Sequence, residues 1–185
     1  CGFYFLQLSE KTKVIAIVFL ILTLLYTLPF FPNKKNARNW AGIKIYIVAL
    51  CWVGVTLFLP IINSGIPLTT DIFLVAIQRF ILIFVLILIF EIIDLTQDDP
   101  HLKTVPQLIG VKQTKWLGSL LLVGFLSLAF LDTNFNFQTM ILKLGVAFTV
   151  FLFLLLANEK HSKYYSSFWA ESIPILWWIL LLIFS

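Results

Sequence analysis

Residues 72–98 read IFLVAIQRFILIFVLILIFEIIDLTQD. The stretch is apolar for about 20 residues apart from one Gln-Arg pair, which is the length a helix needs to cross the hydrocarbon core of a bilayer. It then carries three carboxylates within eight positions, Glu91, Asp94 and Asp98. A continuous apolar run of this length favours a helix, because an open sheet would leave backbone groups unpaired in lipid. The stretch therefore predicts a membrane-spanning helix that ends in a row of acids.

The rest of the chain has the same apolar character. Of its 185 residues, 61% are hydrophobic and 12% are charged, whereas soluble domains average about 45–50% and about 25%. A soluble fold of this size has no interior large enough for so much Leu, Ile and Phe, so most side chains are expected to face lipid or one another. The net charge of +4 suits lipid headgroups or a phosphate-bearing ligand, and no nucleic-acid-binding motif is present. Two cysteines without metal-type spacing support neither a zinc site nor a disulfide framework.

Six stretches reach, or nearly reach, the length and apolarity of a membrane span. We expect a single transmembrane domain, 1–185, that is an all-α polytopic bundle with spans at roughly 14–31, 43–62, 72–93, 116–131, 139–157 and 168–184. The chain opens with Cys and is apolar from the start. We therefore expect a fragment of a longer protein that lacks the preceding helices.

Basic residues occur in every second connection between these spans. The first, third and fifth connections carry Lys or Arg, and the second and fourth carry neither. Positively charged loops stay on the cytoplasmic side, so those three connections, and the acidic row in the third, are expected in the cytoplasm. Lys11 and Lys13, before the first span, are the exception. We expect an integral membrane protein, in a prokaryotic plasma membrane, with its functional loops on the cytoplasmic face.

The spacing of the acids has a chemical meaning. A helix continued through Glu91, Asp94 and Asp98 presents all three on one face. Asp94 and Asp98 then lie one turn apart, about 5–6 Å between Cβ atoms, at a helix C-terminus where the macrodipole disfavours anions. A divalent cation would reverse both effects, and Mg²⁺ is usually held by one or two carboxylates plus substrate phosphates. The pair therefore indicates a Mg²⁺–pyrophosphate site; the alternative is a solvated loop whose Asp98-Asp99-Pro100 turn ends the helix.

A basic segment, FPNKKNAR at 31–38, is expected on the same face of the membrane. Arg forks onto phosphate oxygens and Lys supplies a compact charge, so Lys34, Lys35 and Arg38 are candidate phosphate ligands. The alternative is that they are ordinary anchors of a cytoplasmic loop. Tyr26, about one turn before the segment, is expected in the wall of a cavity at this face.

Together these residues resemble the UbiA superfamily of intramembrane prenyltransferases. Proteins of that family have nine transmembrane helices and two Asp-rich motifs on cytoplasmic loops, and DLTQD at 94–98 matches the second motif, of the type DxxxD. LYTLPFFPNKKNARN at 25–39 looks like a loosened form of the family's Tyr-Pro-x-x-Lys-Arg segment. LKTVPQLIGVKQTK at 102–115 looks like the stretch that follows the second motif. The six spans would then correspond to helices four to nine of the family.

The resemblance implies an alkyl or aryl transfer other than methyl: a prenyl group moves from a prenyl pyrophosphate to an aromatic or other lipophilic acceptor, with Mg²⁺ as cofactor and membrane lipid as surroundings. By this resemblance, Asp94 and Asp98 are expected to bind the metal ion. Glu91 is expected either to support these two ligands without binding the metal or to end the helix. The residues expected to bind pyrophosphate are Lys34, Lys35, Lys103 and, more weakly, Arg38. No catalytic residue separate from these groups is expected.

The family's first Asp-rich motif does not occur in these 185 residues. We therefore expect this segment alone to be inactive and the longer protein to be the enzyme. The alternative is a non-enzymatic polytopic protein, either a transporter or a subunit of a membrane complex, in which the acids form a solvated loop or an ion path. Transporters favour interrupted helices and polar groups near the bilayer midplane, and the sequence shows few of either.

Overall fold

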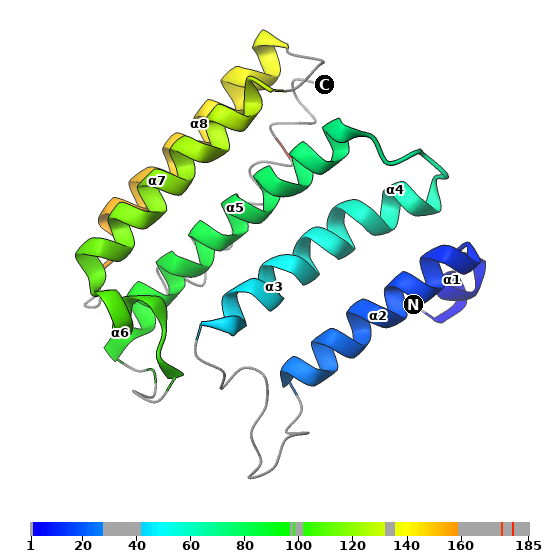
Figure 1. Ribbon diagram of the computed structural model, residues 1–185, viewed down its shortest axis with the longest axis horizontal. Coiled ribbons are helices and arrows are strands. Elements are labelled where there is room, and N and C mark those ends of the chain that lie inside the picture. The colour runs from blue at the N-terminus through cyan, green and yellow to red at the C-terminus, as the bar shows by residue number, and fades with distance from the viewer. Residues whose placement is uncertain are drawn as a thin grey trace. The chain divides into compact units, whose positions relative to one another are not determined.

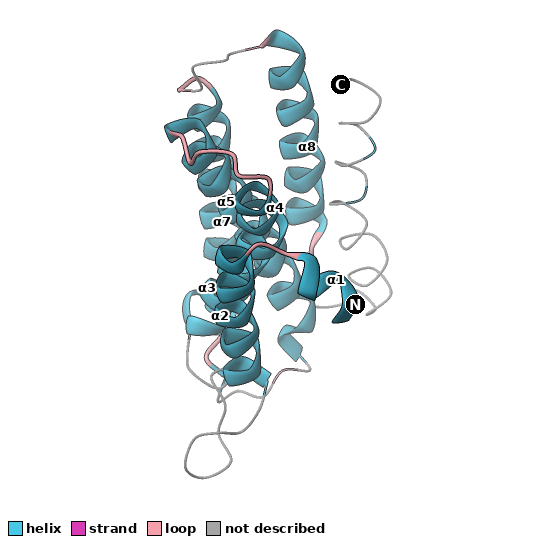
Figure 2. Ribbon diagram, turned by 90° about the vertical axis from the view of Figure 1, so that its right-hand side faces the viewer, coloured by secondary structure: helices cyan, strands magenta, loops and turns pink. Residues whose placement is uncertain are grey.

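The computed structural model describes residues 2–27, 42–96, 98, 102–131 and 136–158, together with 175 and 179. Within these ranges every element is a helix and none is a strand (Figure 2), which confirms the prediction of an all-α protein. The chain divides into two compact units, Cys1–Phe80 and Ile81–Ser185. Each unit is described by itself.

The first unit is made of a helix and a helical rod that pack together. Its elements are α1 (Gly2–Gln7), α2 (Glu10–Thr27), α3 (Ile43–Val53), the π-helical turn η3 (Gly54–Phe58), α4 (Leu59–Asn63) and the first part of α5 (Thr70–Ile93). The elements α3, η3 and α4 follow one another without a break and form the rod (Figure 1). α2 contacts all three of them.

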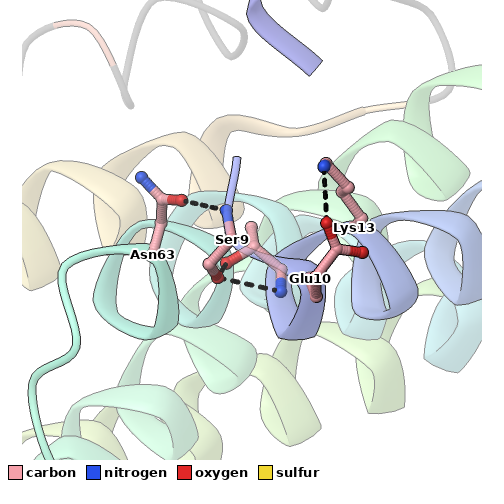
Figure 3. Close-up of polar contacts among 5 residues, drawn as sticks. Ser9, Glu10, Lys13 and Asn63 are labelled. Carbon is pink, nitrogen blue, oxygen red and sulfur yellow. Dashed lines mark hydrogen bonds and ion pairs between the residues drawn. The ribbon is translucent and has the colours of Figure 1, made fainter. Parts of the chain in front are cut away.

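Polar contacts join the start of α2 to the end of α4 (Figure 3). The N–H of Ser9 donates to Oδ1 of Asn63 over 3.3 Å. The Ser9 hydroxyl accepts the N–H of Thr12 over 3.3 Å, which is the usual arrangement of a serine that caps a helix N-terminus. Lys13 and Glu10 form an exposed ion pair at 2.9 Å, of a kind that contributes roughly 0–1 kcal/mol. Ser9 therefore both begins α2 and fixes it to the rod.

The π-helical turn in the rod has a cause in the sequence. Pro60 has no N–H to donate to the carbonyl of Thr56, four residues earlier, and its ring crowds that carbonyl. The backbone widens over Gly54–Phe58, where a backbone hydrogen bond reaches back five residues. Nη1 of Arg79, in α5, donates to the Thr56 carbonyl oxygen over 3.1 Å. A charged residue within an apolar helix thus provides a donor that the proline cannot.

Among the described residues, three helical stretches are long and apolar enough to cross a membrane: Lys44–Asn63, Thr70–Thr96 and Phe137–Leu156. α5 alone has 24 residues, or about 36 Å at 1.5 Å per residue. Neither α2 nor α7 (Val111–Ala129) is among the three; each opens on a polar turn, EKTK in α2 and VKQTK in α7. The predicted span 168–184 lies outside the described residues apart from two positions. Membrane helices are therefore supported, and the count of six stays a prediction.

The second unit contains the last part of α5, the 3₁₀ turn η4 (Asp94–Thr96), α6 (Val105–Ile109), α7 and α8 (Phe137–Leu156). Its core is apolar and is formed by α5, α7 and α8; the central members are Val85, Ile89, Ile92, Phe125, Val146 and Val150. α7 packs closely on α8 at Gly118. A Cβ added at this glycine would lie only 2.7 Å from the side chain of Leu154. Nζ of Lys115 donates to the carbonyl of Leu155 over 2.7 Å, so a cation meets the C-terminal end of α8, where cations are favoured.

Candidate functional site

The acidic row lies where α5 tightens into η4. The N–H of Asp98 donates to the carbonyl of Asp94 over 2.9 Å, which is the i→i−4 bond of an α-helical turn. The α-helix itself ends at Ile93 and Asp94 opens the 3₁₀ turn, but this bond keeps Asp94 and Asp98 one turn apart along the backbone. Both residues are half-buried. Two aspartates one backbone turn apart therefore stand at the end of an apolar helix.

Glu91 has a different environment from the two aspartates. It lies on the preceding turn of α5 and is only 3% exposed. Its Oε2 accepts the N–H of Val105 over 3.1 Å, which joins the end of α5 to the start of α6. Burying a carboxylate is costly unless it accepts hydrogen bonds, and this contact provides one. Glu91 is therefore directed at the backbone of a later segment.

Lys103, a predicted pyrophosphate ligand, lies just before that contact. It is exposed, and its backbone is left-handed with a φ of 47°, a conformation that side chains with a Cβ rarely adopt. The N–H of Thr104 donates to Oε1 of Gln107 over 2.9 Å, as in the capping box of a helix N-terminus. Lys103 is therefore presented to solvent from a short, ordered turn.

The sequence holds a signal for part of this arrangement and none for the rest. In TVPQ at 104–107, Thr stands three residues before Gln and Pro lies in the first turn, a pattern typical of a helix start. It predicts α6, which the six-span interpretation left inside a loop. The bond between Glu91 and Val105 has no such signal, because it joins residues 14 positions apart and depends on how the loop folds.

A pocket of about 410 Å³ opens in the first unit between α2 and the rod. Its lining residues are Thr23, Tyr26, Thr27, Ile47, Val48, Cys51, Trp52, Val55 and Thr56. The hydroxyls of Thr23, Thr27 and Thr56 each donate to a carbonyl of their own helix, over 2.8, 2.9 and 2.7 Å. The wall is consequently almost wholly apolar and suits a hydrocarbon chain or an aromatic ring. Tyr26, which was expected in a cavity wall, belongs to this lining.

Part of the predicted site lies outside the described residues. Lys34, Lys35 and Arg38 fall there, so their binding role stays a prediction. Among the residues that the structure does describe, no group of three or more His, Cys, Asp or Glu side chains is placed to hold a metal ion. A Mg²⁺ site at Asp94 and Asp98 would complete its coordination with water and substrate phosphates, which is the usual arrangement for this ion.

No family model matches the chain, and neither a curated protein nor a solved structure matches it. Function is therefore inferred from the residues and their geometry.

Proposed function

We propose that the chain is the C-terminal part of an intramembrane prenyltransferase similar to the UbiA superfamily, with six spans that correspond to helices four to nine. The observation that carries the proposal is the acidic turn, in which Asp94 and Asp98 follow one another by one helical turn at the end of a helix of bilayer length. Two anions at that place repel each other and oppose the helix macrodipole. A divalent cation held by both carboxylates would remove both penalties.

The chain's own residues have separable tasks in this reaction. Asp94 and Asp98 bind the cation and so hold the pyrophosphate at the end of α5. Lys103 adds positive charge at the phosphate oxygens, and the same task is proposed for the basic segment at 34–38. When bound, Mg²⁺ supplies neutralisation of the charge that builds up on the leaving pyrophosphate. The proposal places this site on the cytoplasmic face of a prokaryotic plasma membrane.

The bond changes follow from the chemistry of the substrate. The bond between the prenyl carbon and the pyrophosphate oxygen breaks, and its electron pair leaves with the pyrophosphate. The lipophilic acceptor supplies the electron pair of the new bond and loses a proton. Groups that stabilise the departing negative charge speed such a step. The apolar pocket beside Tyr26 is proposed to take a lipophilic part of the reactants, either the isoprenoid chain or the ring of an acceptor.

The test measures Mg²⁺-dependent release of pyrophosphate from a radiolabelled prenyl pyrophosphate. It uses the full-length protein in detergent, with the upstream helices that the resemblance implies. Asp94→Ala and Asp98→Ala should each lower the rate at least about 100-fold, because losing a metal ligand costs several kcal/mol of transition-state stabilisation.

Asp71→Ala is the matched control for this test. Asp71 lies in the first turn of α5, at the opposite end of the same helix from the acidic turn, so its loss should leave the rate within about twofold of wild type. All three variants should keep a cooperative thermal transition. Wild-type rates in both folded metal-site variants would reject the assignment of the metal.

A second candidate is a transporter or a subunit of a membrane complex. One observation favours it: the π-helical turn Gly54–Phe58 interrupts a candidate membrane helix, and Arg79 binds the backbone there. Irregular helices with polar groups inside the membrane are typical of transporters. In that case the wild-type protein would release no pyrophosphate in the assay above, and substitutions of Arg79 would alter solute flux in proteoliposomes.

A further inference from the structure

Glu91 forms a hydrogen bond across the ends of the segment 91–105, which contains the acidic row. It belongs to α5, and its Oε2 accepts the N–H of Val105, the first residue of α6, over 3.1 Å. The N–H groups in the first turn of a helix have no partner within that helix. Glu91, in α5, therefore supplies the acceptor that the N–H of Val105 lacks within α6. The two residues are 14 positions apart. Asp94, Asp98 and Lys103 all lie between them.

Described residues near both ends of this segment make further hydrogen bonds. At its start, the N–H of Asp98 binds the carbonyl of Asp94 over 2.9 Å. At its end, Gln107 accepts the N–H of Thr104 over 2.9 Å. Joining the ends of a flexible loop removes conformational freedom from everything between them. The contact of Glu91 with Val105 therefore restricts Asp94, Asp98 and Lys103, the described residues that are proposed to bind metal and pyrophosphate.

The backbone of Lys103 indicates how firmly the end of the segment is held. Its φ of 47° is unfavourable for a residue with a side chain and persists only where the surrounding contacts enforce it. The next residue, Thr104, is only 2% exposed, and the one after it is Val105. The bond that Glu91 makes is thus within two residues of the strained position.

We propose that Glu91 is a positioning residue, which holds Asp94, Asp98 and Lys103 in their binding arrangement by accepting the N–H of Val105. This inference rests on the proposed function, since it takes the aspartates to be metal ligands. It assigns Glu91 a hydrogen-bonding task for which the negative charge is not needed. A residue that bound the metal directly would need that charge.

Two variants separate the hydrogen bond from the charge. Glu91→Gln keeps an oxygen that can accept the N–H of Val105, and removes the charge. Glu91→Leu removes both at similar size. Glu10→Leu is the matched control, because the side chain of Glu10 is 88% exposed and its ion pair is with Lys13, on the same turn of α2. All variants are made in the full-length protein, and each is checked for a cooperative thermal transition.

The first measurement is hydrogen exchange without divalent cations, followed in peptides that contain Val105. Exchange should be slow in the wild type, in Glu91→Gln and in Glu10→Leu. In Glu91→Leu it should be at least about tenfold faster, because the closed segment opens locally. This measurement reports the contact itself and is independent of any metal or activity.

The second measurement is binding of Mn²⁺ alone, followed by electron paramagnetic resonance. Glu91→Leu should weaken binding about 10–100-fold, as loss of a supporting group behind metal ligands does, whereas Glu91→Gln should bind nearly as the wild type does. Wild-type exchange and binding in Glu91→Leu would overturn the proposal. Equal loss of binding in both Glu91 variants, with slow exchange in Glu91→Gln, would also overturn it, because Glu91 would then be a ligand.

The failure of the proposed function gives a different result. In that case Asp94→Ala would bind Mn²⁺ as well as the wild type does. Faster exchange in Glu91→Leu would then show a loop held for structural reasons alone, and the positioning role would fall with the metal site.

Discussion

Polar side chains form different kinds of hydrogen bond in the first unit and in the second. The hydroxyls of Thr23, Thr27 and Thr56 each return to a backbone carbonyl of their own helix. Glu91 and Lys115 instead bind the backbone of a different helix. In lipid, a polar group must find its partner inside the protein, and the nearest carbonyl is on the same helix. Near a helix end, longer side chains are free to join elements that are distant in the sequence.

Arg79 is an exception to the first pattern, and a proline in the rod gives the carbonyl its need for a donor. It binds the carbonyl of Thr56, 23 residues earlier, because Pro60 in the rod has no N–H for that carbonyl. Proline within a membrane helix is tolerated where a neighbouring helix provides the missing donor. A long-range polar contact within the span therefore repairs the backbone, whereas the contact of Glu91 orders a candidate binding segment.

The largest effect on stability is expected from disturbing the contact between α2 and the rod in the first unit. A Cβ at Gly54 would collide with the ring of Phe19 in α2, so Gly54→Ala should destabilise the protein by about 1–3 kcal/mol, as overpacking of a close contact does. The measurement is the free energy of unfolding in mixed detergent micelles. The matched control is Gly124→Ala in α7, where nothing lies within 4 Å of the added methyl group.

Gly124→Ala should be neutral or should stabilise by up to about 1 kcal/mol, because Ala is the better helix former. A Gly54→Ala variant as stable as this control would show that the contact of α2 with the rod is loose.

An intermediate effect is expected from Arg79→Met, which removes the donor to Thr56. A backbone carbonyl left without a partner costs about 1–3 kcal/mol, partly offset because a charge is removed from the membrane. The net loss of stability should be about 1 kcal/mol. In a Pro60→Ala background, position 60 regains its N–H and the same substitution should cost less, which a double-mutant cycle measures. Equal costs in the two backgrounds would mean that the proline does not determine the role of Arg79.

The smallest effect on stability is expected at Lys103. Asn adopts the left-handed conformation more readily than Lys, so Lys103→Asn should keep or slightly raise the thermal midpoint. Binding of inorganic pyrophosphate with Mg²⁺ should weaken, by at most about fivefold, because an exposed charge pair contributes about 0.2–1 kcal/mol. Lys103→Arg keeps the charge and should bind as the wild type does. Unchanged binding in Lys103→Asn would remove Lys103 from the proposed site.

The helical architecture could be predicted because its causes are local. Long apolar runs predict helices wherever they occur, and the structure has α2, α3, α5, α7 and α8 where five of the six runs lie. Polar turns are the reason that the number of spans is harder to predict than the number of helices. α7, for example, begins at Val111, before its apolar run at Trp116, and its polar start includes Lys115, which binds the end of α8.

The sequence by itself determined that the protein is helical and rich in membrane-length helices, and that Asp94 and Asp98 are one turn apart. Those properties depend on residues within a few positions of one another. Tertiary structure alone decided that Glu91 binds Val105, that Arg79 donates to the carbonyl of Thr56, and that Lys103 is left-handed. The physical reason is that each of these depends on contacts with segments that folding, and not sequence spacing, brings within hydrogen-bonding distance.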